Sequence, residues 1–189
     1  MKKLLIILLF IPLISFGQEL QPKKSSIRNS INKAEIHKIN KDWTTIAKFK
    51  SGIGEVVKFF PIEFINLKTG IATRALQLDM EIKTQSNSVL KNNDTYKTTY
   101  IDLEEIDEFI LFIEKYVIPN LDLKFKDKSS QFTFKAKEMT LYYLIYEKKR
   151  RLTIKLNDYD NSKFINHTFW TETQVKKIPE LLNVLKTLK

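Results

Sequence analysis

Strand patterns and helix patterns form two successive blocks along this chain, and that order limits the folds open to it. In each block, several short apolar or alternating segments precede a single amphipathic helix pattern. The helices are predicted at about residues 102–117 and 171–188, where apolar residues recur at helical spacing. Strands that follow one another without a crossover helix pair antiparallel. The sequence therefore predicts an α+β fold with one or more antiparallel sheets and two amphipathic helices. The predicted strands lie near residues 43–50, 55–66, 71–83, 96–101, 121–126, 131–138, 140–147, 152–157 and 163–170.

The two predicted helices begin in the same way, 69 residues apart. Asp102 and Glu105 have the spacing of a capping box at the first helix, and Thr171 and Gln174 have it at the second. Two β-strands-then-helix repeats produced by an internal duplication would explain this likeness. Convergence would explain it equally, because any strand that leads into a capped helix uses the same residue types.

Two prolines qualify these predictions. Pro61 lies inside the strand predicted at residues 55–66, which favours a sheet edge or a bulge there because proline has no backbone N–H. Pro179 lies inside the helix predicted at 171–188, and it must either kink that helix or restart it.

The N-terminus has the three parts of a cleavable secretory signal peptide, over residues 1–17. Two lysines precede an apolar run that ends at Ile14, and the small residues Ser15 and Gly17 stand where a signal peptidase reads the chain. The apolar run is shorter than the roughly 20 residues that span a bilayer. Cleavage is expected before Gln18, and the mature protein is expected to be soluble in the periplasm or outside the cell, with no transmembrane segment.

The chain contains no cysteine. Disulfides, thiolate metal ligands and thiol catalysis are therefore excluded, and so is the thioether-linked lipid of a bacterial lipoprotein. The mature chain must be held together by packing alone, which its length allows for a single domain.

Composition divides the mature chain into an arm and a domain. Residues 18–42 are polar and basic and form either an extended N-terminal arm or a short helix. Apolar residues recur in the arm at helical spacing, at Ile27, Ile31 and Ala34. Residues 43–189 are predicted to form a single α+β domain, in which 43–118 and 121–189 are candidate halves.

Basic residues outnumber acidic ones, for a formal net charge of +10. The excess lies at the two ends of the mature chain, in residues 18–50 and 121–189, whereas residues 51–120 carry a net negative charge. An exported protein is not expected to meet nucleic acid, so an envelope protein, anionic lipid headgroups or acidic glycans are the candidate partners. A lysine-rich surface can also serve solubility alone.

Lys148, Lys149, Arg150 and Arg151 form the densest run of charge, between two predicted strands. A charged hairpin end of this kind is a candidate anion-binding site for phosphate or sulfate. The alternative is a solvated turn that discourages aggregation between sheet edges.

Large side chains occupy both faces of the strand predicted at residues 140–147. Either this strand is central and covered on both sides, or Tyr142 and Tyr146 belong to a contact surface on one face.

No catalytic, cofactor-binding or metal-binding motif is present. His37 and His167 lack partners at zinc-ligand spacing, and the chain has neither a nucleophile elbow nor a glycine-rich phosphate loop. The sequence therefore favours a non-catalytic binding or structural module of the periplasm or cell exterior. Two alternatives stay open: a hydrolase of cell-wall or extracellular polymer that uses carboxylates brought together by folding, and an envelope protein that binds anionic lipid headgroups or glycans.

Overall fold

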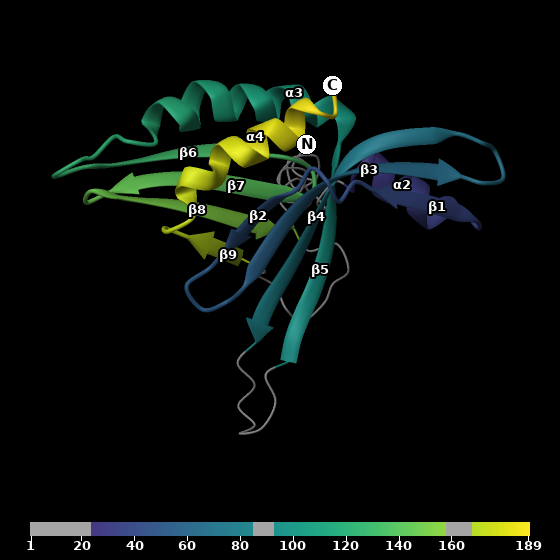
Figure 1. Cartoon of the computed structure of the whole chain (residues 1–189), viewed down its shortest axis with the longest axis horizontal. Coiled ribbons are helices and arrows are strands. Elements are labelled where there is room, and N and C mark those ends of the chain that lie inside the picture. The colour runs from purple at the N-terminus through teal and green to yellow at the C-terminus, as the bar shows by residue number, and fades with distance from the viewer. Residues whose placement is uncertain (1–23, 85–92, 158–167) are drawn as a thin grey trace, which may run out of the picture.

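The structure is a computed structural model that describes residues 24–84, 93–157 and 168–189. It has the predicted α+β architecture, with a five-stranded and a four-stranded antiparallel sheet and three α-helices in the described part of the chain (Figure 1). The predicted signal peptide lies outside the described residues. No described helix is long and apolar enough to cross a bilayer.

The first sheet has the order β1-β3-β4-β5, and β2 pairs with the same edge of β3 as β1 does. Its strands are β1 (His37–Lys41), β2 (Ala47–Lys50), β3 (Val56–Asn66), β4 (Ala72–Thr84) and β5 (Asn93–Asp102). Pro61 lies where the partner of β3 changes from β2 to β1, and its carbonyl accepts a hydrogen bond from the Asp42 amide at 3.0 Å. The missing N–H of Pro61 faces this break, so no ladder hydrogen bond is lost there.

The second sheet has four strands in consecutive order, all antiparallel. They are β6 (Ser129–Lys135), β7 (Met139–Tyr146), β8 (Lys149–Leu156) and β9 (Thr168–Thr171). The strand predicted near residues 121–126 is wrong, because this segment pairs with no strand and forms an irregular connection. The strand predicted near 163–170 is described only from Thr168 onward.

The helices are α2 (Ser26–Lys33), α3 (Leu103–Phe112) and α4 (Ile178–Lys186). The predicted capping box is present at α3, between Asp102 and Glu105. One π-helical turn (Ile113–Val117) and one 3-10 turn (Ile118–Asn120) extend α3, and together they span the predicted helix.

The last helix begins later than the sequence predicts. Thr171 ends β9, and its hydroxyl accepts a hydrogen bond from the Gln174 amide at 3.3 Å. A 3-10 turn (Val175–Lys177) follows, and Pro179 lies in the first turn of α4, where a missing N–H costs nothing. Pro179 therefore lies where a new helix begins and does not kink a continuous one.

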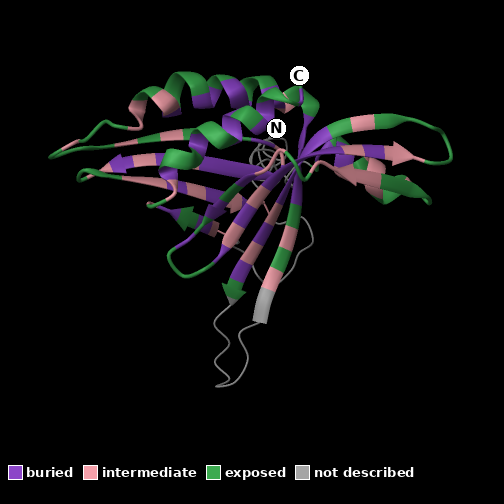
Figure 2. Cartoon of the chain, in the orientation of Figure 1, coloured by how far each residue is buried: buried purple, intermediate pink, exposed green. Residues whose placement is uncertain are grey.

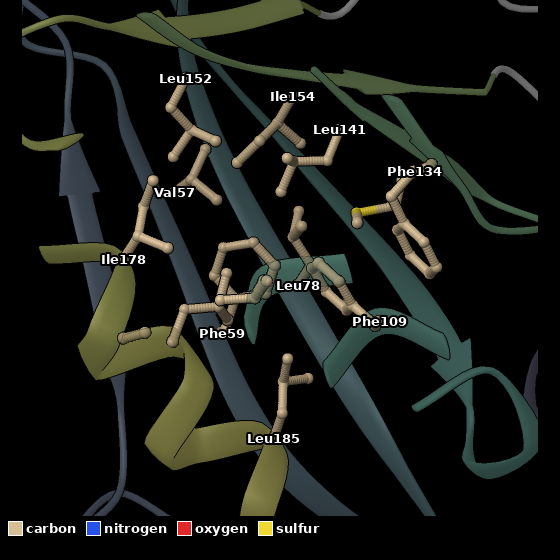
Figure 3. Close-up of a cluster of buried hydrophobic side chains, with 14 of the residues drawn as sticks. Val57, Phe59, Leu78, Phe109, Phe134, Leu141, Leu152, Ile154, Ile178 and Leu185 are labelled. Atoms are coloured by element: carbon tan, nitrogen blue, oxygen red, sulfur yellow. The ribbon is translucent and has the colours of Figure 1, made fainter. Parts of the chain in front are cut away.

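The main core lies between the inner faces of the two sheets and the helices α3 and α4, where Figure 2 shows the buried residues concentrated. The first sheet contributes Phe59 and Leu78, and the second sheet contributes Leu141 (Figure 3). Phe109 of α3 stacks on Phe134 of β6, with ring centroids 4.4 Å apart. Both candidate halves of the chain therefore share one core.

A second, smaller core lies on the opposite face of the first sheet, under α2. It consists of Ile27, Phe60, Ile62, Phe64, Ala75 and Tyr100. Consecutive residues of β3 point to opposite faces, so Phe59 enters the main core and Phe60 enters the smaller one. Within the segment predicted as an arm or a short helix, residues 26–33 form α2, which packs on the sheet, whereas residues 37–41 form β1, which was not predicted from the sequence.

Candidate binding face on the second sheet

Strand β7 presents one face to the main core and the other to the outside. Leu141, Tyr143 and Ile145 are buried in the core shared with α3 and α4. Tyr142, Leu144 and Tyr146 point the other way and are half-buried. These three residues define the outer face of the second sheet, together with the outward residues of β6, β8 and β9.

Four side chains on this outer face and at its border form one cluster, in which Tyr146, Arg151 and Glu172 are hydrogen-bonded and Trp170 contacts Arg151 through its ring. The Arg151 guanidinium lies over two rings, with its carbon 4.5 Å from the centroid of Trp170 and 5.3 Å from that of Tyr146. Nε and Nη2 of Arg151 donate to Oε1 of Glu172 at 3.1 and 2.7 Å, and Nη2 also donates to the Tyr146 hydroxyl at 2.7 Å. The Tyr146 hydroxyl in turn donates to Glu172. The cluster is therefore held in one geometry from several sides.

Hydrogen bonding fixes the charge of this cluster. The bonds from Tyr146 and Arg151 lower the pKa of Glu172, and the bond to Glu172 raises the pKa of Tyr146. At neutral pH the cluster therefore holds a carboxylate, a neutral phenol and a guanidinium. All the described hydrogen bonds to Glu172 end on Oε1, so Oε2 has no donor among the described residues. Nη1 of Arg151 likewise has no acceptor among them.

A hollow of about 430 Å³ adjoins the outer face beyond Tyr146. Lys126, Lys128, Asp127 and Glu147 line it together with Ser129 and Tyr146, so its formal charges balance. The Lys128 ammonium lies 5.0 Å from the centroid of the Phe125 ring. The hollow extends the face without adding net charge to it.

The predicted anion-binding run does not stay together. Lys148 forms the β7–β8 turn with Glu147, and both residues have positive φ, at 67° and 44°. Lys149 and Arg151 follow in β8 and point to the outer face. Arg150 points to the opposite side, where its Nη1 donates to the Leu121 carbonyl at 2.7 Å.

The structure thus brings Lys149 and Arg151 onto the same face as Tyr142 and Tyr146, which the sequence proposed as a separate contact surface. Sequence reasoning missed Trp170 and Glu172. The alternation in β9 could have revealed them, because Phe169 is buried and the next residue, Trp170, is 40% exposed on the other face.

Two buried carboxylates among the described residues, Glu138 and Asp102, lie elsewhere and accept several hydrogen bonds each. Glu138, at the β6–β7 turn, is fully buried and accepts from the Ser25 amide and hydroxyl, at 2.9 and 2.6 Å. It also accepts from Nε and Nη2 of Arg28, both at 2.7 Å. Thr99 Oγ1 and the Tyr100 amide complete the set, at 2.7 and 3.0 Å. Glu138 therefore joins the start of α2 to β5 and to the second sheet.

Asp102 has a related structural role. Its carboxylate accepts from the Ser26 and Ile27 amides at the start of α2, at 2.7 and 3.0 Å, and from the Lys137 ammonium at 2.7 Å. Burial alone would raise the pKa of Asp102, but these hydrogen bonds outweigh it and the pKa is lowered. Asp102 thus holds α2 against the start of α3.

In the described part of the chain, two carboxyls have a raised pKa, which the hydrolase alternative requires of a general acid. Burial raises the pKa of both Glu55 and Glu105. Glu105 is bound to the amides of Lys137 and Asp102, whereas Glu55 follows the Ser51 turn in the first sheet. Neither residue lines the hollow beside Tyr146, so these carboxyls give the hydrolase hypothesis no paired acids in that hollow.

Comparisons of this chain with models of protein families, with curated proteins and with solved structures find no match.

Proposed function

We propose that this chain is an exported, non-catalytic binding module whose ligand lies on the outer face of the second sheet. The observation that carries the proposal is the position of Arg151, stacked over Tyr146 and Trp170 and held by Glu172. A charged side chain ordered in this way before the ligand arrives loses little entropy on binding. Aromatic residues beside an arginine, such as the half-buried Tyr146 and the more exposed Trp170, are also the residue types enriched in binding hot spots.

The export half of the proposal rests on the signal pattern of residues 1–17. Fractionation of the native cells, followed by mass spectrometry of the purified protein, tests it. The mature protein is expected outside the cytosol with Gln18 at its N-terminus. An intact Met1 on protein recovered from the cytosol would contradict export.

The binding half is tested with the protein's own tryptophans. The chain contains only Trp43 and Trp170, so the Trp43→Phe variant leaves Trp170 as the sole tryptophan reporter. Titration of this variant with polysaccharide extracted from the cell envelope is expected to change the Trp170 emission. In parallel ¹⁵N spectra of the wild-type protein, the shifted amides are expected to map to β7, β8 and β9. Shifts confined to the first sheet, or cleavage of the polysaccharide, would contradict the proposal.

A further inference from the structure

We propose that the ligand of the outer face is an acidic polysaccharide, whose sugar rings stack on Tyr142 and Trp170 and whose acidic groups reach Lys135, Lys149 and Lys155. This inference rests on the proposed function, because it names the ligand of the same face.

The aromatic residues lie in one row across the sheet. Tyr142 of β7 is paired with Thr153 of β8, which is paired in turn with Trp170 of β9. Neighbouring strands are about 4.8 Å apart, so the two rings start from backbones about 10 Å apart, with only a threonine between them. Sugar rings have apolar C–H faces and a polar rim. The ring of Tyr142 and the face of the Trp170 ring that Arg151 does not cover are complementary to those apolar faces.

Cations lie on both sides of this row, displaced from it along the strand direction. Lys135 and Lys155 lie in one cross-strand row of the face, and Lys149 lies in another, beside Tyr146. Lys155 lies six positions after Lys149, which is about 20 Å along an extended strand. A ligand that contacts both of these lysines must therefore be longer than one or two sugar units, as a polysaccharide is.

None of these three lysines forms an ion pair with a carboxylate in the described residues. Glu172, which borders this face, is paired with Arg151, and the charge of Lys149 also helps to lower its pKa. The outward strand residues therefore present a net positive charge, which favours an anionic ligand over a neutral one.

The centre of the face also offers hydrogen bonds to hydroxyl groups. Nη1 of Arg151 is an unused donor and Oε2 of Glu172 is an unused acceptor among the described residues. A sugar hydroxyl can both donate and accept, so it can satisfy this pair next to the ring of Trp170. A lipid phosphate could accept from Nη1 but has no donor for Oε2, which is why we place a glycan here and not a bilayer surface.

The experiment measures the affinity of the Trp43→Phe protein for fragments of polygalacturonate, hyaluronate and chondroitin sulfate, by Trp170 fluorescence and calorimetry. Neutral maltodextrin of the same length and phosphatidylglycerol vesicles serve as comparisons. At least one acidic fragment is expected to bind at least about tenfold more tightly than maltodextrin. Raising the salt from 0.05 to 0.5 M is expected to weaken that binding about tenfold, because the Debye length shrinks several-fold.

Paired variants locate the binding. Lys149→Gln with Lys155→Gln is expected to weaken binding about fivefold to tenfold, within the range for two exposed charge contacts. The matched control is Lys48→Gln with Lys50→Gln, which removes two exposed lysines from β2 and is expected to change affinity less than twofold. Trp170→Ala in the protein that retains Trp43 is expected to lower the affinity at least about tenfold in calorimetry. The ¹⁵N spectrum of each variant is compared with that of the wild-type protein to verify that the variant is folded.

The outcomes separate the inference from the proposed function. Equal affinity for maltodextrin and the acidic fragments, with shifts on the outer face, would overturn the acidic ligand and leave the binding face standing. Binding to vesicles without binding to any fragment would overturn the glycan in favour of a membrane surface. If none of the three acidic fragments shifts the amides of the outer face, the acidic-polysaccharide inference is overturned. If the total envelope polysaccharide, neutral chains included, also leaves those amides unshifted, the proposed function is overturned as well.

Discussion

Replacing Glu138 should show how far the protein depends on the contact between α2 and the two sheets. The carboxylate of this fully buried residue accepts six hydrogen bonds, from Ser25, Arg28, Thr99 and Tyr100. Glu138→Ala removes the acceptor for all six and leaves the Arg28 guanidinium without its buried partner. Breaking a buried ion pair from one side costs about 3–5 kcal/mol.

Glu138→Ala should therefore lower the free energy of unfolding by about 4 kcal/mol. A domain of this size is stable by roughly 5–15 kcal/mol, so the variant should lose a quarter of its stability or more. Each kcal/mol lowers Tm by about 2–4 °C in proteins of 150–250 residues, so Tm should fall by about 10 °C.

Urea unfolding at pH 7, followed by far-UV circular dichroism, measures the loss. Glu138→Gln keeps the volume but removes the charge, and it should lose about half as much as Glu138→Ala, because one oxygen still accepts. Glu108→Ala is the matched control: Glu108 is exposed on α3, and its removal should change stability by less than about 0.5 kcal/mol. A loss below 1 kcal/mol for Glu138→Ala would refute the reasoning, because six hydrogen bonds would then contribute less than one ordinary bond.

Three further predictions concern acid, the core and a turn. Burial alone would raise the pKa of Glu138, but its hydrogen bonds outweigh burial and lower it. Its contribution is therefore complete above its unfolded pKa of about 4.3 and is lost as the pH falls below that value, so urea midpoints should drop below about pH 4, and less so in Glu138→Gln. Phe109→Ala, which removes a fully buried ring stacked on Phe134, should cost about 3–5 kcal/mol in the same unfolding assay. Gly70 has φ +72°, so Gly70→Ala should lower the free energy of unfolding by about 1–2 kcal/mol. Gly52 has no positive φ, so the control Gly52→Ala should not destabilise the protein. Equal thermal midpoints for the two variants would contradict this prediction.

The sequence was sufficient to predict the fold class because the fold depends on local patterns. The alternation of residues 71–83 produced β4, and the capping box at Asp102 marked the start of α3. The segment 121–126 also alternates, yet it has no partner strand. Alternation indicates only which side of an extended segment would be apolar. Whether the segment becomes a strand also depends on a partner strand, and the segment's own sequence does not reveal one.

The start of the last helix could not be predicted from the capping pattern alone. Thr171 and Gln174 form the expected hydrogen bond from amide to hydroxyl. The same residue Thr171 also pairs with Leu152 in the second sheet, and this pairing holds it in a strand. Tertiary pairing therefore delayed the helix until Ile178, beyond the reach of a local signal.

The buried network around Glu138 shows the same limit for polar residues. Glu138 is 113 residues from Ser25 in the chain, and 39 residues from Thr99. Nothing near Glu138 in the sequence marks it as buried, because it stands between Lys137 and Met139 in a segment rich in charge. Its burial follows from the packing of α2 and β5 around one turn, which only the assembled fold brings about.

The candidate binding face depends partly on local alternation and partly on contacts between distant strands. Only the part that depends on alternation could be predicted from the sequence. Alternation places Lys149 and Arg151 on one side of β8 and Arg150 on the other, so the run of four cations could have been divided correctly once β8 was known to begin at Lys149. The contact of Arg151 with Trp170 depends instead on the register between β8 and β9, which join across a long connection. The site is therefore a property of three strands in register, and a shift of one residue between β8 and β9 would turn Trp170 into the core and abolish it.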